Sequence, residues 1–127
     1  MLSESARMSS AAEARFRVQT PASVARVVKV ISLDSASDRE ISTLVEEVPA
    51  ADLVVMVASA GADANAAAII GEACSRNRVM TTALVIRAAS ATDEALSRTL
   101  AQVRPWSLMV VIPSDEAYVE DILRSFR

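Results

Sequence analysis

Polar residues follow each of four apolar runs in the sequence, and their side chains could hold an anionic ligand. The set, with one glycine among them, is Asp34, Ser59, Gly61, Asp63, Asn65, Arg87, Ser114 and Asp115. If the runs are parallel β-strands, ligands bind beyond their carboxyl ends, near the point where the strand order reverses. Hydroxyl, amide and guanidinium groups gathered there would suit a small anionic metabolite or a nucleotide. These residues are therefore the candidate ligand-binding residues.

The stretch from Ser59 to Asn65 lies where nucleotide-binding proteins place a phosphate-binding loop. Such loops need closely spaced glycines, because the backbone must approach the phosphates where a Cβ atom would collide. The chain has only two glycines, Gly61 and Gly71, and neither the dinucleotide nor the P-loop fingerprint can be written with them. A helix N-terminus could still bind an anion through free amides. Asp63 would repel that anion, so we expect it to be the helix N-cap, with ligand contact as the alternative.

Three of the candidate aspartates could converge on a divalent cation, since carboxylate oxygens suit magnesium. They are Asp34, Asp63 and Asp115. Each lies at a predicted turn or helix start, where a capping role is expected, so no metal site is predicted. Arg87 is the best anion-binding side chain of the set. The alternative for Arg87 is an ion pair with Asp63 or Asp115.

The composition excludes several kinds of chemistry. Without histidine, the chain cannot form a Ser-His-Asp or Cys-His nucleophile or the common zinc sites. Its one cysteine, Cys74, cannot form an internal disulfide and is expected to be a buried, unreactive residue. A net charge of -3 and scattered arginines argue against nucleic acid as a partner. We predict no catalytic residue and no cofactor, and a protein that is not an enzyme is favoured.

Four strand-like runs alternate with four helix-like segments. The strands are predicted at residues 24–33, 53–58, 79–86 and 108–112. The first helix is expected to start at the capping box Ser37-Asp-Arg-Glu40 and the third at Thr92. The predicted buried stripes of the helices are Ile41, Leu44, Val45 and Val48; Ala66, Ile69, Ile70, Ala73 and Cys74; Leu96, Leu100 and Val103; and Val119, Ile122, Leu123 and Phe126.

Strands that are apolar throughout, each followed by a helix, indicate a parallel sheet covered on both faces. We therefore predict an α/β fold, a three-layer α/β/α Rossmann-like sandwich with a mainly parallel sheet of four or more strands. Residues 1–22, rich in Ser, Ala, Glu and Arg, are predicted to form an N-terminal appendage. Residues 23–127 are predicted to form a single domain.

The apolar content predicts an interface with another subunit. Apolar residues make up 52% of the chain and the mean hydropathy is +0.31, which is high for so small a domain. We expect a homo-oligomer or a protein partner. No apolar run approaches the ~20 residues that span a bilayer, and no signal-peptide pattern is visible, so we expect a cytoplasmic protein without a membrane partner. The excess of alanine and arginine points to a bacterial source.

Four stretches of the chain carry a resemblance to a known family. ADLVVMVASAG, ANAAAIIGEAC, MTTALVIRA and SLMVVIPSDE occur in this order. They resemble the middle of the nucleotide-binding domain of the tubulin and FtsZ family, over about residues 51–126, and the last stretch ends in the family's Ile-Pro-x-Asp-like turn. The family's phosphate loop is a run of glycines and threonines, whereas residues 62–67 here are Ala, Asp and Asn. The resemblance therefore implies a degenerate relative with this fold and a habit of subunit association, without GTP hydrolysis.

Three functions remain open at this point. The favoured one is a non-catalytic domain that acts through self-association or a protein partner. The alternative is a binding module for a small anionic metabolite or nucleotide, held by Ser59, Asn65, Arg87 and Ser114. A small enzyme that uses aspartates and a metal is the third.

Overall fold

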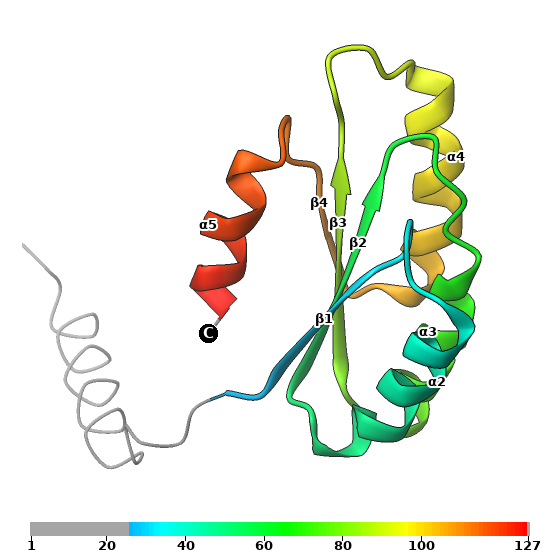
Figure 1. Ribbon diagram of the computed structural model, residues 1–127, viewed down its shortest axis with the longest axis vertical. Coiled ribbons are helices and arrows are strands. Elements are labelled where there is room, and N and C mark those ends of the chain that lie inside the picture. Colours follow the sequence, from blue (N-terminus) through cyan, green and yellow to red (C-terminus); the bar gives the residue numbers. More distant parts are fainter. Residues whose placement is uncertain (1–25, 127) are drawn as a thin grey trace, which may run out of the picture.

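The computed structural model describes residues 26–126, and the predicted appendage at residues 1–22 lies outside the described residues. Strands and helices alternate through the described part (Figure 1). The elements are β1 Val28–Ser32, α2 Asp38–Glu47, the 3-10 helix η1 Val48–Ala50, β2 Leu53–Ser59, α3 Ala66–Arg76, β3 Met80–Ile86, α4 Asp93–Val103, the 3-10 helix η2 Arg104–Trp106, β4 Met109–Val111 and α5 Ala117–Phe126. None of the described helices is long and apolar enough to span a bilayer.

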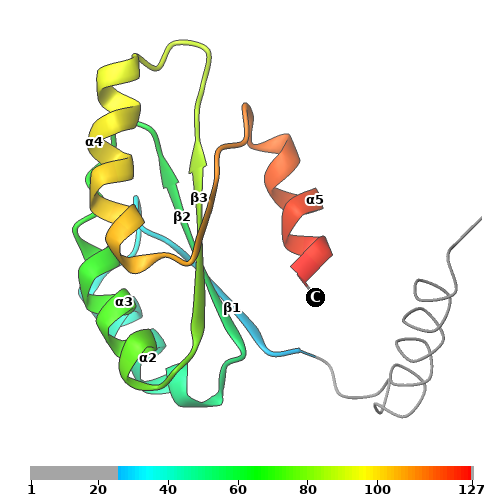
Figure 2. The same ribbon diagram turned by 180° about the vertical axis from the view of Figure 1, so that it is seen from behind.

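The four strands form one parallel sheet in the order β1-β2-β3-β4. Each strand pairs with the next one along the chain, so that Val28 lies beside Leu53 and Leu53 beside Met80. Because every crossover moves the same way across the sheet, the three crossover helices α2, α3 and α4 lie on one face (Figures 1 and 2). Helix α5, which follows the last strand, lies on the other face (Figures 1 and 2). The predicted three-layer Rossmann-like architecture is confirmed. The order of the described strands never reverses, so they form no crevice of the kind that a reversal creates.

Strand β2 is buried on both faces, as its continuous apolar run predicts. Val54, Met56 and Ala58 belong to the larger core under α2, α3 and α4, whereas Leu53 and Val55 belong to the smaller core under α5. Side chains alternate between the two faces of a strand, so each core takes every second residue. This burial fixes the carboxyl end of β2, from which the candidate phosphate loop leaves.

Side-chain caps start α2 and α4 where the sequence predicts them. The Ser37 hydroxyl accepts a hydrogen bond from the Glu40 N–H at 3.2 Å, and the Thr92 hydroxyl accepts one from the Ala95 N–H at 3.1 Å. In the capping box, the Glu40 carboxylate accepts a 3.3 Å hydrogen bond from the Ser37 hydroxyl. In a complete capping box the Ser37 N–H would donate to the Glu40 carboxylate. Here the Ser37 hydroxyl donates to it instead, so only half of the box is formed.

Helix α3 is rotated relative to its predicted buried face. The prediction for Ile69 is wrong, since this side chain is 55% exposed, whereas Ile70 is fully buried. The reason is Gly71, against which Trp106 of η2 packs, so that this side of α3 turns inward. The buried residues of α3 are Ala67, Ile70, Gly71, Ala73 and Cys74. The stripes of the other three helices face their cores as predicted.

Helix α5 covers its face of the sheet incompletely. Three apolar side chains, Val30 on β1, Met80 on β3 and Met109 on β4, lie on that face according to the strand register. Each of them is between 40% and 51% exposed. The three-layer sandwich therefore has one full helical layer and one thin layer in the described residues.

Candidate functional site

The loop between β2 and α3 is held by two polar side chains of α4. The Gly61 N–H donates to the Thr99 hydroxyl at 2.8 Å, and the Ala64 N–H donates to the Gln102 side-chain oxygen at 2.8 Å. Thr99 is fully buried. A phosphate-binding loop keeps such amides free for the ligand, whereas here α4 supplies their acceptors.

The polar side chains of the same loop bind one another and Gln102. The Gln102 side-chain nitrogen donates to Asp63 at 3.1 Å and to Asn65 at 2.9 Å. Asp63 also accepts from the Asn65 backbone and side-chain nitrogens, at 3.1 and 2.9 Å. Asn65, not Asp63, occupies the N-cap position of α3 and makes no side-chain cap, so the prediction of Asp63 as N-cap is wrong. Asp63 closes a turn of the Asx type before the helix, because its carboxylate reaches the amide two residues ahead.

Backbone conformation and packing explain why glycine occupies positions 61 and 71, without any ligand. Gly61 has a φ of +94°, a conformation that side chains disfavour, and an added Cβ would lie 3.2 Å from the Ala95 Cβ. An added Cβ at Gly71 would lie 2.4 Å from the Trp106 Cβ. The first glycine serves the turn and the second serves packing between α3 and η2.

Asp34 and Ser59 come together at the carboxyl ends of β1 and β2. The Ser59 N–H donates to both carboxylate oxygens of Asp34, at 3.2 and 3.1 Å. Asp34 is exposed. The carboxylate thus fastens the loop after β1 to the end of β2, and it places negative charge where an anionic ligand would need positive charge.

The structure corrects the predicted partner of Arg87. Its guanidinium pairs with Asp93, in the first turn of α4, and not with Asp63 or Asp115. The side chain of Asp93 is 89% exposed and that of Arg87 is 40% exposed. The two residues are six positions apart in the sequence, and the ion pair joins the end of β3 to the helix that follows it.

The remaining candidates lie at the start of α5. Asp115 accepts a hydrogen bond from the N–H of Ala117, the first residue of α5, at 2.6 Å. Its carboxylate is thus used by the backbone at the helix start, through the same two-residue spacing as in Asp63. Ser114 is exposed just before it. Asp34, Asp63 and Asp115 each bind a backbone amide, and among residues 26–126 no three acidic, cysteine or histidine side chains gather as a metal site would require.

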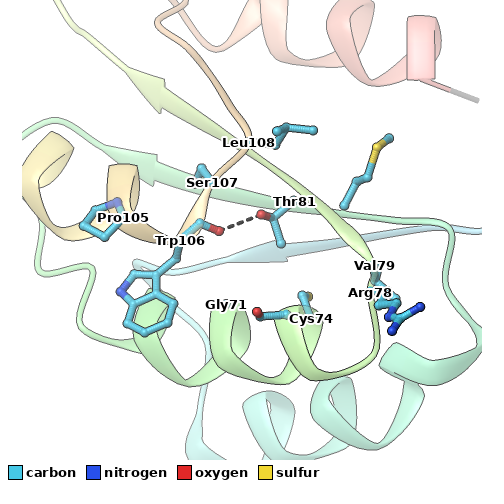
Figure 3. Close-up of a pocket in the computed structure, with 11 residues that line it drawn as sticks. Gly71, Cys74, Arg78, Val79, Thr81, Pro105, Trp106, Ser107 and Leu108 are labelled. Carbon is cyan, nitrogen blue, oxygen red and sulfur yellow. Dashed lines mark hydrogen bonds between the residues drawn. The ribbon is translucent and has the colours of Figure 1, made fainter.

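A hollow of about 480 Å³ lies at the opposite end of the sheet, at the amino ends of β3 and β4 (Figure 3). Two of its hydroxyl groups are already used, since the Thr81 hydroxyl donates to the Trp106 carbonyl at 2.6 Å and the Ser107 hydroxyl to the Val103 carbonyl at 2.7 Å. Cys74 lies in its wall, and burial raises the pKa of this thiol to about 11. The hollow therefore offers neither an acid–base pair nor an activated nucleophile.

Comparisons of the chain with protein-family models, with curated proteins and with solved structures found no match in any of the three.

Sequence reasoning missed the two residues that decide the state of the loop, Thr99 and Gln102. The sequence places Thr99 at helical spacing within the buried stripe of Leu96, Leu100 and Val103, and so indicates that its hydroxyl is buried. A hydroxyl on a buried face requires a hydrogen-bond partner elsewhere in the fold. Gln102 is partly exposed on α4 and gave no such signal.

Proposed function

We propose that this chain is a non-catalytic α/β domain that acts through self-association or through a protein partner. We also propose, from the sequence resemblance, that it is a degenerate relative of the nucleotide-binding domain of the tubulin and FtsZ family. The observation that carries the first proposal is the apolar surface that the described fold leaves open.

That surface lies on the edge and the thinly covered face of the sheet. Its residues, Val30, Met80, Leu108, Met109 and Ile112, are between 40% and 75% exposed. Single exposed apolar side chains are ordinary, whereas several on neighbouring strands mark contact surfaces. Three of these residues come from one segment, 108–112, which concentrates the apolar surface on β4.

The loop after β2 supports a non-catalytic function. A nucleotide would need the amides of Gly61 and Ala64, and it would have to displace Thr99 and Gln102 to reach them. Each lost bond would cost about 0.5–1.5 kcal/mol, although the Thr99 hydroxyl would still donate to the Ala62 or Ala95 carbonyl. The acidic side chains of Asp34 and Asp63 would add electrostatic repulsion to that cost.

A second candidate is a small anionic ligand at Arg87. The ion pair between Arg87 and Asp93 is exposed, and exposed pairs contribute only about 0–1 kcal/mol, so an anion can replace Asp93 at little cost. This candidate keeps the predicted location beyond the end of β3 and requires no phosphate loop.

Two measurements test these functions. Sedimentation equilibrium over the micromolar range should show a concentration-dependent dimer or larger species, and a monomer throughout would contradict self-association. Thermal unfolding with GTP, Mg²⁺ and small carboxylates should show no shift for GTP. A ligand at a hundred times its Kd adds about 2.7 kcal/mol to the unfolding free energy, so a GTP-dependent rise of several degrees would refute the argument that the loop after β2 is closed to nucleotides. A rise with small carboxylates that Arg87→Gln abolishes would favour the second candidate.

A further inference from the structure

Strand β4 is an unguarded edge of the sheet. It is the last strand in the order, and no second neighbour pairs with it among the described residues. The segment from Ser107 to Pro113 contains no charged residue. Leu108 is 75% exposed and Ile112 is 42% exposed. Natural proteins protect edge strands with charges, prolines or bulges, and residues 108–112 contain neither a charge nor a proline, so this edge can pair with another strand.

The opposite edge, β1, carries a charge that β4 lacks. Lys29 lies within β1 and forms an ion pair with Glu47 at 3.4 Å. A charged side chain on an edge strand disfavours pairing with a second chain at this edge.

The free backbone groups of β4 follow from its pairing with β3. The Arg87 N–H donates to the Pro113 carbonyl at 2.9 Å, which turns the backbone of Pro113 toward β3. Backbone groups of successive residues point to opposite sides of a strand, so Met109 and Val111 also face β3. The N–H and C=O groups of Val110 and Ile112 then point away from the sheet. The Leu108 N–H is already used, since it donates to the Thr81 carbonyl of β3 at 2.9 Å, so Leu108 offers only its carbonyl to a partner.

We propose that two copies of this chain pair through β4 in antiparallel fashion, about a twofold axis at Val110, and so join their sheets into one. The proposal deepens the proposed function by naming its interface. Val110 exchanges backbone hydrogen bonds with the partner's Val110, and the Ile112 N–H bonds the partner's Leu108 carbonyl. Leu108, the most exposed apolar side chain of the described residues, then lies beside the partner's Ile112.

A twofold contact requires a surface that is complementary to itself. Residues 108–112 meet this condition, because all five are apolar and each stands opposite another apolar residue in the antiparallel register. The contact is closed, since each copy uses the one edge strand of the described sheet that carries no charged residue. A dimer results rather than a fibre, because the β1 edges left at both ends of the joined sheet are protected.

The test uses the full chain and a matched pair of variants. Leu108→Lys places a charge in the contact, and Val30→Lys places one on the opposite edge, where Val30 is 40% exposed. Sedimentation equilibrium should show that Leu108→Lys raises the dimer Kd roughly tenfold or more, equivalent to about 1.4 kcal/mol, while Val30→Lys leaves it unchanged. Circular dichroism confirms that both variants are folded.

A disulfide provides a second measurement that does not depend on the lysine variant. Opposed residues in such a pair have Cα atoms about 5.5 Å apart, within the range that a disulfide spans. Val110→Cys should therefore give a covalent dimer on mild oxidation, whereas the wild type, whose Cys74 is buried, should not.

The outcomes separate the interface from the proposed function. A wild-type protein that stays monomeric would overturn the β4 interface and self-association, and would leave a different protein as the partner of the proposed function. A wild-type dimer that Leu108→Lys does not weaken, and that Val110→Cys does not cross-link, would overturn the β4 interface and leave self-association through another surface. If Leu108→Lys is unfolded, the cross-link of Val110→Cys decides, and its absence refutes the interface.

Discussion

Substitution of Gly71 by alanine separates helix propensity from packing, because the two effects have opposite signs. At an ordinary helix position, replacing glycine by alanine stabilises a protein by about 1 kcal/mol. At Gly71 the new Cβ would lie 2.4 Å from the Cβ and 2.8 Å from the Cγ of Trp106. The Trp106 Cβ is attached to the backbone of η2, so a rotamer change cannot move it away.

The expected loss follows from these two terms. Overpacking costs about 1–3 kcal/mol, and the upper end applies here because η2 itself must shift. Subtracting the gain in helix propensity, about 1 kcal/mol, leaves a net loss of about 2 kcal/mol in the unfolding free energy of Gly71→Ala. For a domain of about 105 residues, that loss lowers Tm by roughly 9 °C.

Thermal unfolding followed by circular dichroism measures this loss. Ser75→Ala, at an exposed position of the same helix, is the matched control and should raise Tm slightly. In a Trp106→Gly background the collision is absent, so Gly71→Ala should there raise Tm. An increase in Tm on introducing Gly71→Ala into the otherwise unchanged chain would refute the packing of Trp106 on α3.

Three further predictions concern the loop, the face of α3 and the thiol. Thr99→Val should lower the unfolding free energy by about 1–3 kcal/mol, because the Gly61 N–H loses its acceptor. Thr99→Ser keeps the hydroxyl and should lower it less. Equal losses of the two variants in urea unfolding would rule out a role for the hydroxyl. Ile70→Asp should abolish the cooperative thermal transition, since it buries an unpaired charge. Ile69→Asp, at an exposed position, should change the unfolding free energy by no more than about 0.5 kcal/mol. The reverse result would mean that α3 is rotated differently. The pKa of Cys74, raised by burial from 9.0 to about 11, means that the folded state holds the thiol proton more tightly than the unfolded state. The contribution of Cys74 to stability should therefore be constant with pH below 9 and be lost as pH rises from 9 toward 11, so that stability falls more over this range than in Cys74→Ala. Thiol reagents at neutral pH should label the protein only in denaturant, and rapid labelling of the native protein would contradict this.

Features set by nearby residues could be predicted from the sequence. The caps at Ser37 and Thr92 bind amides three residues ahead, and both were predicted. The continuous apolar run of β2 correctly indicated a strand buried on both faces of a parallel sheet. In each case the residues that decide the structure, a capping pair or a continuous apolar run, lie within about ten positions of one another in the sequence.

Features set by distant residues could not be predicted. The bonds from the loop after β2 to Thr99 and Gln102 join positions 38 residues apart, and no pattern in either segment indicates the other. The orientation of Ile69 depends on Trp106, which reaches α3 only once the sheet has formed. Arg87 is an exception, because its partner Asp93 is only six residues away and was still not predicted; the choice among Asp63, Asp93 and Asp115 depends on the course of the chain after β3.

The consecutive order of the strands has a consequence for biosynthesis. Val28 pairs with Leu53, Leu53 with Met80 and Thr82 with Met109, so that paired residues are 25 or 27 positions apart (53−28, 80−53 and 109−82). No strand waits for a partner from the far end of the chain, which keeps the contact order low for a parallel sheet. As the polypeptide leaves the ribosome, β1 and β2 can therefore pair, and α2 can cover them, before β4 has been translated.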